Sequence, residues 1–140
     1  MEERILNEIL KAKDSIEIKV RYNDTDNGIV HFKNYLVYSD DGFINFMKHI
    51  ENPVETAIRK GIIFPVKKIE ILFENSASFG DHLIVETQIK EIEEKSIAFI
   101  HKIYRESDKA LLADIQCVRL VMELETKNLL DVKKFLIEFV

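Results

Sequence analysis

The chain has 140 residues, 46% of them hydrophobic and 32% charged, so it can form one globular domain with a substantial core but not two. Its formal net charge of −5 argues against non-specific binding to nucleic acid or to an anionic membrane. Because Cys117 is the single cysteine, and because neither a signal peptide nor an apolar stretch of membrane-spanning length is visible, we expect a cytoplasmic protein without an intramolecular disulfide.

Helical and strand patterns alternate in the first half of the chain. Residues 2–12 carry apolar side chains at helical spacing, which predicts a short amphipathic helix. Ser15–Tyr22 alternates apolar and charged residues, which predicts a strand, and Asn23–Val30 is expected to be a loop. The dense aromatic and apolar residues of 32–50 predict a helix that is buried on more than one side. A proline before Val54–Lys60 and a glycine after it predict a short helix there.

The second half of the chain has the alternation of an antiparallel sheet. Four strands are predicted, at Val66–Asn75, Leu83–Ile92, Ser96–Arg105 and Leu111–Leu124. Turn residues separate these strands. In the last strand the apolar phase slips near Cys117-Val118, which predicts a β-bulge at that point.

The expected elements form a single α+β domain over residues 1–140. A short closing helix is predicted at Asp131–Val140, and residues 1–14 are expected to be an N-terminal helical extension. A helix as apolar as the one predicted at 32–50 needs apolar surface on several sides. We therefore expect an antiparallel sheet that wraps around this long central helix.

The segment between the first strand and the central helix is the strongest candidate for chemistry. It contains two carboxylates, Asp24 and Asp26, followed by Asn27-Gly28 and then the helix. The first N–H groups of a helix are free and the helix dipole is positive there, so a carbonyl can be polarised while a nearby carboxylate attacks it or activates a water. The bland alternative is that these residues only form a turn and a helix cap.

Several motifs resemble one known family. They are Val20–Asp26 with its Asp-x-Asp pair, Gly28–Val30, Asn34-Tyr35, Tyr38 with Asp40, and the turn Phe79–Asp81. Together they resemble a hotdog-fold acyl-CoA thioesterase of the 4-hydroxybenzoyl-CoA thioesterase family, over roughly residues 16–124. The resemblance implies a hotdog fold, with the extra N-terminal helix outside it, and hydrolysis of an acyl-CoA thioester to a carboxylic acid and free coenzyme A.

The resemblance also assigns roles to individual residues. It implies that Asp26, or else Asp24, is the nucleophile or general base, and that backbone N–H groups between Gly28 and Phe32 bind the thioester carbonyl. Two departures affect these assignments: only Asn27 separates Asp26 from Gly28, where the family usually has two residues, and Phe32 stands where some relatives carry a histidine. The residues expected to bind substrate are Gly28, His31, Phe32 and Tyr35.

The expected partners are an acyl-CoA substrate and further copies of the chain. We expect no metal, because His49, His82 and His101 are scattered without metal-ligand spacing, and no cofactor beyond the coenzyme A of the substrate. An exposed sheet edge needs a partner, so a homodimer or homotetramer is expected. The sequence leaves open the acyl group, an acyl-carrier-protein substrate, and a non-catalytic acyl-CoA-binding role.

Overall fold

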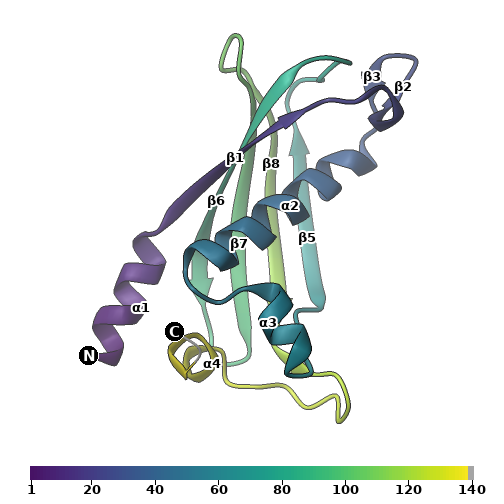
Figure 1. Cartoon of the computed structure of the whole chain (residues 1–140). Coiled ribbons are helices and arrows are strands. Elements are labelled where there is room, and N and C mark those ends of the chain that lie inside the picture. Colours follow the sequence, from purple (N-terminus) through teal and green to yellow (C-terminus); the bar gives the residue numbers. More distant parts are fainter. Residues whose placement is uncertain (139–140) are drawn as a thin grey trace.

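A five-stranded antiparallel sheet forms one layer of the molecule, and helix α2 (Lys33–His49) lies across it (Figure 1). The computed structural model describes residues 1–138 of the chain. Neighbouring strands are hydrogen-bonded in the order β1-β6-β7-β8-β5, so β1 and β5 are the two edges. This arrangement confirms the predicted α+β fold with a long central helix. The strand bounds are Lys13–Lys19 for β1, Val66–Phe73 for β5, His82–Ile92 for β6, Ser96–Arg105 for β7 and Leu111–Leu120 for β8.

The remaining elements close the two ends of the sheet. Helix α1 (Glu2–Lys11), α3 (Val54–Arg59) and α4 (Val132–Glu138) lie toward one end, and the small β2–β3 hairpin lies at the other (Figure 1). Helices α1 and α3 were predicted nearly at these bounds. Of the predicted helix Asp131–Val140, Val132–Glu138 is helical, and residues 139–140 lie outside the described residues. A two-stranded ladder joins β4 (Ile62–Ile63) to β9 (Met122–Glu123).

The predicted bulge near Cys117-Val118 is wrong for its own strand. In β8 the irregularity is at Leu112, which has no partner between the pairs Ile103–Ala113 and Tyr104–Leu111. Near Val118 it is the neighbouring strand β5 that carries the register shift, between Val66 and Lys68. Val118 is apolar although it lies on the outer face of the sheet. The sequence therefore looks as if the alternation of inward and outward residues shifts at this position. The strand also ends at Leu120 rather than at Leu124.

Helix α2 lies close against the sheet at Gly42. A Cβ atom on Gly42 would lie 2.7 Å from Oγ1 of Thr87 and 2.9 Å from Cγ1 of Val85. Thr87 Oγ1 is in turn 2.8 Å from Nδ1 of His101, and both of these side chains are buried. Burial, together with the positive charge of Arg119, lowers the pKa of His101 to about 3, so the imidazole is neutral in the folded protein. The glycine thus lets the helix pack onto a buried polar pair.

Two apolar clusters form the core on either side of this contact. One surrounds the C-terminal half of α2 and includes Phe46 and Phe99, and the other surrounds its N-terminal half and includes Tyr38 and Leu83. The inward residues of β7 alternate with outward ones, as the sequence pattern predicts. The second cluster is the support on which the β2–β3 hairpin and the start of α2 rest.

Candidate active site

The segment that the sequence analysis treats as a loop forms a short 3₁₀ turn and a tight hairpin. The 3₁₀ turn covers Tyr22–Asp24, and the hairpin pairs β2 (Thr25–Asp26) with β3 (Ile29–Val30). Between the two strands, Asn27 has φ 53° and Gly28 has φ 92°. Positive φ at both central residues is typical of a type I′ turn, for which Asn-Gly is the preferred sequence. The prediction that Asn23–Val30 is a loop is therefore wrong, because Asn27-Gly28 favours a hairpin turn between two short strands.

Asp24 is buried and fixes this segment to helix α2. Its carboxylate accepts hydrogen bonds from the hydroxyl of Tyr38 (3.1 Å) and from the backbone N–H of Arg21 (3.1 Å), and its carbonyl accepts one from the side-chain amide of Asn34 (2.6 Å). Burial alone would raise the pKa of Asp24, but the hydrogen bonds from Arg21 and Tyr38 outweigh it and lower the pKa. This carboxylate is thus a charged anchor inside the fold.

Asp26 lies on the open side of the hairpin. Its side chain is 76% exposed, and Oδ2 is 3.8 Å from Nε2 of His31. The His31 ring stacks on Phe32 with 4.5 Å between ring centroids. Of the two acids, therefore, Asp26 is the one that a ligand can reach directly.

One backbone N–H between Gly28 and Phe32 has no acceptor among the described residues. That group is the N–H of Phe32, which lies immediately before the 17-residue helix α2. Free N–H groups at a helix start, reinforced by the helix dipole, favour negative charge. The other four are engaged: Gly28 with Thr25 Oγ1, Ile29 in its pairing with Asp26, Val30 with the carbonyl of Ala77, and His31 with the carbonyl of Asp24.

A hollow of about 270 Å³ lies beside this N–H group. Tyr35 forms part of its wall although the side chain is almost wholly buried, and the Tyr35 hydroxyl accepts a hydrogen bond from the N–H of Ala77 (3.0 Å). Burial raises the pKa of Tyr35, so its hydroxyl stays neutral. The full lining is Val30, Phe32, Tyr35, Phe73, Glu74, Asn75 and Ser76.

The exposed carboxylate of Asp26 thus lies near His31, and the next residue, Phe32, carries the free N–H and lines the partly apolar hollow. A family model described as the thioesterase-like superfamily matches residues 20–140. The chain belongs to this superfamily. The match begins immediately after β1, so α1 and β1 both lie outside it.

Relatives of known name agree with this membership. The chain is 32% identical to YneP of Bacillus subtilis (strain 168) over 89 residues, which are 63% of this chain and 64% of that protein. It is 27% identical to the acyl-CoA thioesterase YbgC of Haemophilus influenzae over 93 residues, which are 65% of this chain and 68% of YbgC. These alignments span about two thirds of the length of the curated relatives.

A solved member of the superfamily has the same fold. The 4-hydroxybenzoyl-CoA thioesterase of Pseudomonas sp. strain CBS-3 superposes with a TM-score of 0.81 at 25% identity, covering 91% of this chain and 99% of that one. The hotdog fold that the motifs implied is confirmed, as is the resemblance to hotdog-fold acyl-CoA thioesterases.

Arg119 was missed by the sequence analysis and lies inside the thioesterase-like fold. It donates to the carboxylate of Asp40 (2.6 Å) and to the carbonyl of Phe64 (3.0 Å), and its guanidinium lies 3.9 Å from the centre of the Phe43 ring. These residues line a mainly apolar hollow of about 210 Å³ between α2 and α3. The period-2 alternation of β8, which puts Cys117 and Arg119 on the inner face, was the available signal.

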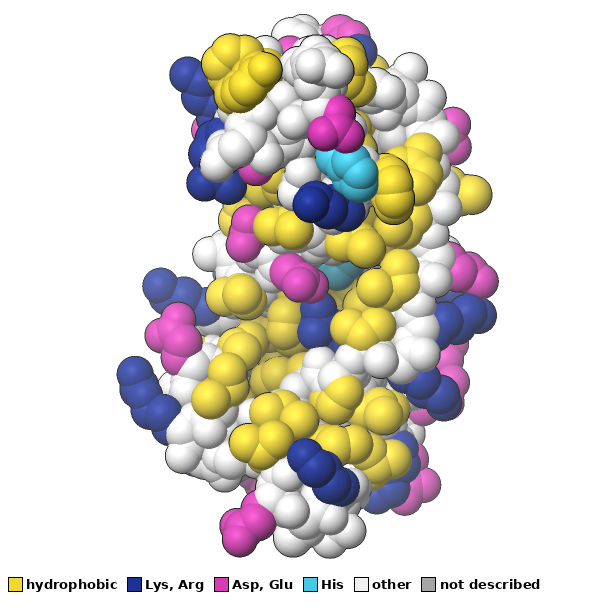
Figure 2. Space-filling view, turned by 90° about the vertical axis from the view of Figure 1, so that its right-hand side faces the viewer, with side chains coloured by type: hydrophobic (Ala, Val, Ile, Leu, Met, Phe, Trp, Pro, Cys, Tyr) yellow, Lys and Arg dark blue, Asp and Glu magenta, His cyan; other side chains and the backbone are white. Residues whose placement is uncertain are grey.

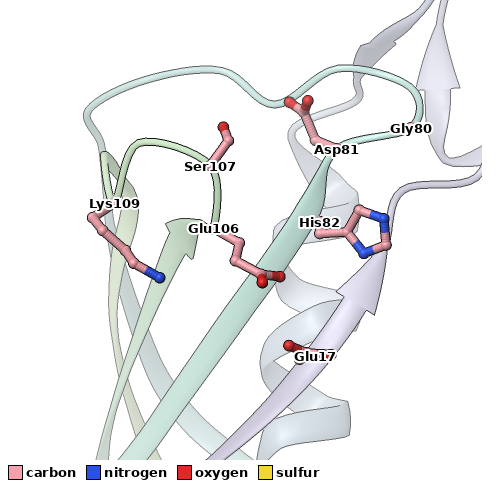
Figure 3. A pocket seen from close by; sticks show the side chains of 7 residues that line it. All are labelled: Glu17, Gly80, Asp81, His82, Glu106, Ser107 and Lys109. Carbon is pink, nitrogen blue, oxygen red and sulfur yellow. The ribbon is translucent and has the colours of Figure 1, made fainter.

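A larger hollow lies elsewhere. It measures about 620 Å³ and lies between the turn before β6 and the turn between β7 and β8, as Figure 3 shows. The carboxylate of Asp81 at its rim accepts the N–H of Ser78 (2.9 Å), which closes the turn. It is an open surface depression between two turns, and no residue of α2 lines it.

The described residues 1–138 also bear on metal and membrane binding. Within them, no three histidine, cysteine, aspartate or glutamate side chains are grouped as a metal site requires. No helix in that range is long and apolar enough to cross a membrane.

Proposed function

We propose that the protein hydrolyses acyl-CoA thioesters, with Asp26 as nucleophile or general base and the N–H of Phe32 as oxyanion donor. The observation that carries the proposal is an exposed carboxylate that lies 3.8 Å from His31, the residue immediately before the free N–H at the start of a long helix. The names of relatives in the superfamily support an acyl-CoA substrate. This arrangement supplies the two groups that thioester hydrolysis needs, because the thiolate is already a good leaving group.

The chemistry follows from where negative charge develops. As a general base, Asp26 takes a proton from a water whose oxygen attacks the thioester carbon, and the Phe32 N–H stabilises the charge on the former carbonyl oxygen. The C–S bond then breaks, and the proton passes from Asp26 to the thiolate. As a nucleophile, Asp26 would instead attack the thioester carbon and expel the thiolate, which forms a mixed anhydride. Water then hydrolyses the anhydride in a second step, which regenerates Asp26, releases the carboxylic acid and supplies the proton that the thiolate takes up.

The acyl group is proposed to enter the hollow beside Phe32. Its walls include the rings of Phe32, Tyr35 and Phe73 together with polar groups from residues 74–76. An aromatic or a short aliphatic acyl group fits such a lining. Neither Gly28 nor His31 lines this hollow, and their contact with substrate stays a prediction.

The first test is release of free thiol from a panel of short, long and aromatic acyl-CoAs. Asp26→Asn keeps the size of the side chain but removes its basicity, and we expect kcat to fall by about 10²–10⁴-fold while coenzyme A esters still bind. Glu125→Gln, the same change in an exposed turn, is the control and should leave kcat unchanged. Unchanged turnover in Asp26→Asn would refute the assignment. Binding without hydrolysis of any ester by the unaltered protein would favour a carrier-protein substrate or a non-catalytic role.

A pair of variants at Phe32 tests the oxyanion donor. Phe32→Pro removes the N–H, and the φ of −54° at this position is compatible with proline. Phe32→Ala removes the same ring but keeps the N–H. We expect Phe32→Pro to have a kcat about 10²–10³-fold below that of Phe32→Ala. Equal kcat values for the two variants would exclude this N–H from the reaction.

We further propose that the protein forms a homodimer, or a homotetramer built from dimers, through strand β5. This edge strand exposes Leu72 and Phe73 at 65% and 51% of their surface. The other edge, β1, shows lysine and glutamate at its exposed positions, which discourages pairing. Figure 2 shows the face that includes the β5 edge, where hydrophobic side chains predominate along the middle. A cytoplasmic location stays a prediction.

A further inference from the structure

The tight turn between β2 and β3 determines which side chains meet above the hairpin. Its two-residue loop pairs Asp26 with Ile29, and the N–H of His31 donates to the carbonyl of Asp24 (3.1 Å), one step beyond the ladder. His31 therefore lies two residues past the partner of Asp26. Such diagonal positions share a face and are within reach of long side chains. The short loop thus places an imidazole beside the exposed carboxylate.

Helix α2 fixes the orientation of that imidazole and determines which ring nitrogen carries its proton. The backbone N–H of Lys33, in the first turn of the helix, donates to Nδ1 of His31 (3.2 Å). A nitrogen that accepts a hydrogen bond carries no proton, so the neutral ring has its proton on Nε2. Nε2 is the atom that lies 3.8 Å from Oδ2 of Asp26, and the stack on Phe32 holds the plane of the ring.

Asp26 has no other side-chain partner among the described residues. An exposed carboxylate on a two-residue strand can rotate between rotamers, and only some of these point it at a carbonyl held by the Phe32 N–H. A small misplacement of a reacting group can cost about 10²-fold in rate. A neighbouring donor that favours one rotamer is therefore valuable at this position.

We propose that His31 is a positioning residue that holds the Asp26 carboxylate toward the N–H of Phe32 through its Nε2–H. This role rests on the proposed function. It differs from direct binding of the substrate by His31, because the effect passes through Asp26.

The kinetic test compares His31→Phe with His31→Gln, using benzoyl-CoA and butyryl-CoA as probes. His31→Phe keeps a ring that can stack on Phe32 but removes both nitrogens, and we expect kcat to fall about 10- to 100-fold with KM changed less than about 2-fold. His31→Gln retains an N–H donor at similar reach and should recover most of kcat. In an Asp26→Asn background, His31→Phe should cause no further loss. A rise in KM at unchanged kcat, or an equal loss in both backgrounds, would overturn the proposal.

A second readout does not depend on turnover. Nitrogen-15 NMR of the imidazole, assigned by its loss in His31→Gln, should place the neutral-state proton on Nε2. A proton on Nδ1 in a protein that hydrolyses the probes would overturn the role of His31 while leaving that of Asp26. Absence of hydrolysis by the unaltered protein would overturn the proposed function, and with it any catalytic role for this contact.

Discussion

Replacing Gly42 by alanine tests how closely the central helix is seated on the sheet. The added Cβ would meet Thr87 Oγ1 at 2.7 Å and Val85 Cγ1 at 2.9 Å, and Thr87 cannot rotate away without losing its contact to His101. Overpacking of this kind costs about 1–3 kcal/mol, while alanine gains about 1 kcal/mol over glycine in helix propensity. With two contacts below 3 Å we expect the upper part of this range, a net loss of about 1–2 kcal/mol. For a domain of this length, that corresponds to a melting temperature lower by about 3–7 °C.

Thermal unfolding by calorimetry or circular dichroism, at one fixed protein concentration, measures this shift. The control is Lys48→Ala on the exposed side of the same helix, where we expect a change within about 0.5 kcal/mol. If Gly42→Ala unfolds at or above the temperature of the unaltered protein, the helix is not as close to Thr87 as the structure places it. The explanation of Gly42 by close approach would then be wrong.

Asp24→Asn should destabilise the fold by about 1–3 kcal/mol at neutral pH, because it weakens buried hydrogen bonds to Arg21 and Tyr38. The pKa of Asp24 is lowered on folding, so its contribution to the free energy of unfolding is present above the unfolded pKa near 3.8 and is lost as the pH falls through the folded pKa. Denaturant titrations below pH 4 should therefore show a smaller loss of stability in Asp24→Asn than in the unaltered protein. Leu72→Lys on the exposed edge strand should shift light-scattering mass toward the monomer, and an unchanged mass would show that β5 is not the contact.

Local patterns predicted most elements of the fold because their causes are local. Alternation along the strands and the apolar density of α2 both reflect which side chains face the core. Which of Asp24 and Asp26 is buried could not be predicted this way. It depends on Tyr38, which reaches Asp24 only once the helix packs against the hairpin. The pairing of Arg119 with Asp40 likewise joins positions far apart in the chain.

The β2–β3 hairpin is an element that the sequence pattern did not predict. Asn27-Gly28 was noted as a loop signal, but its specific turn type fixes a register, and the register brings His31 beside Asp26. The loop that is one residue shorter than is usual in the family forms a regular two-residue turn. The bulge at Leu112 could not be predicted from the sequence. Leu112 and Ala113 are both apolar and both buried, and two apolar residues in succession do not by themselves indicate a bulge.

The proposed reacting groups, Asp26 and the N–H of Phe32, come from one short stretch of chain around the β2–β3 hairpin. Their relative placement is therefore set by backbone that is continuous between them, whereas the hollow beside them is built from separate strands and loops. The lining of the hollow can therefore change while the hairpin backbone stays the same. Substitutions along the β5 region would change the walls that Phe73 and residues 74–76 contribute to the hollow, while the hairpin keeps its own backbone geometry.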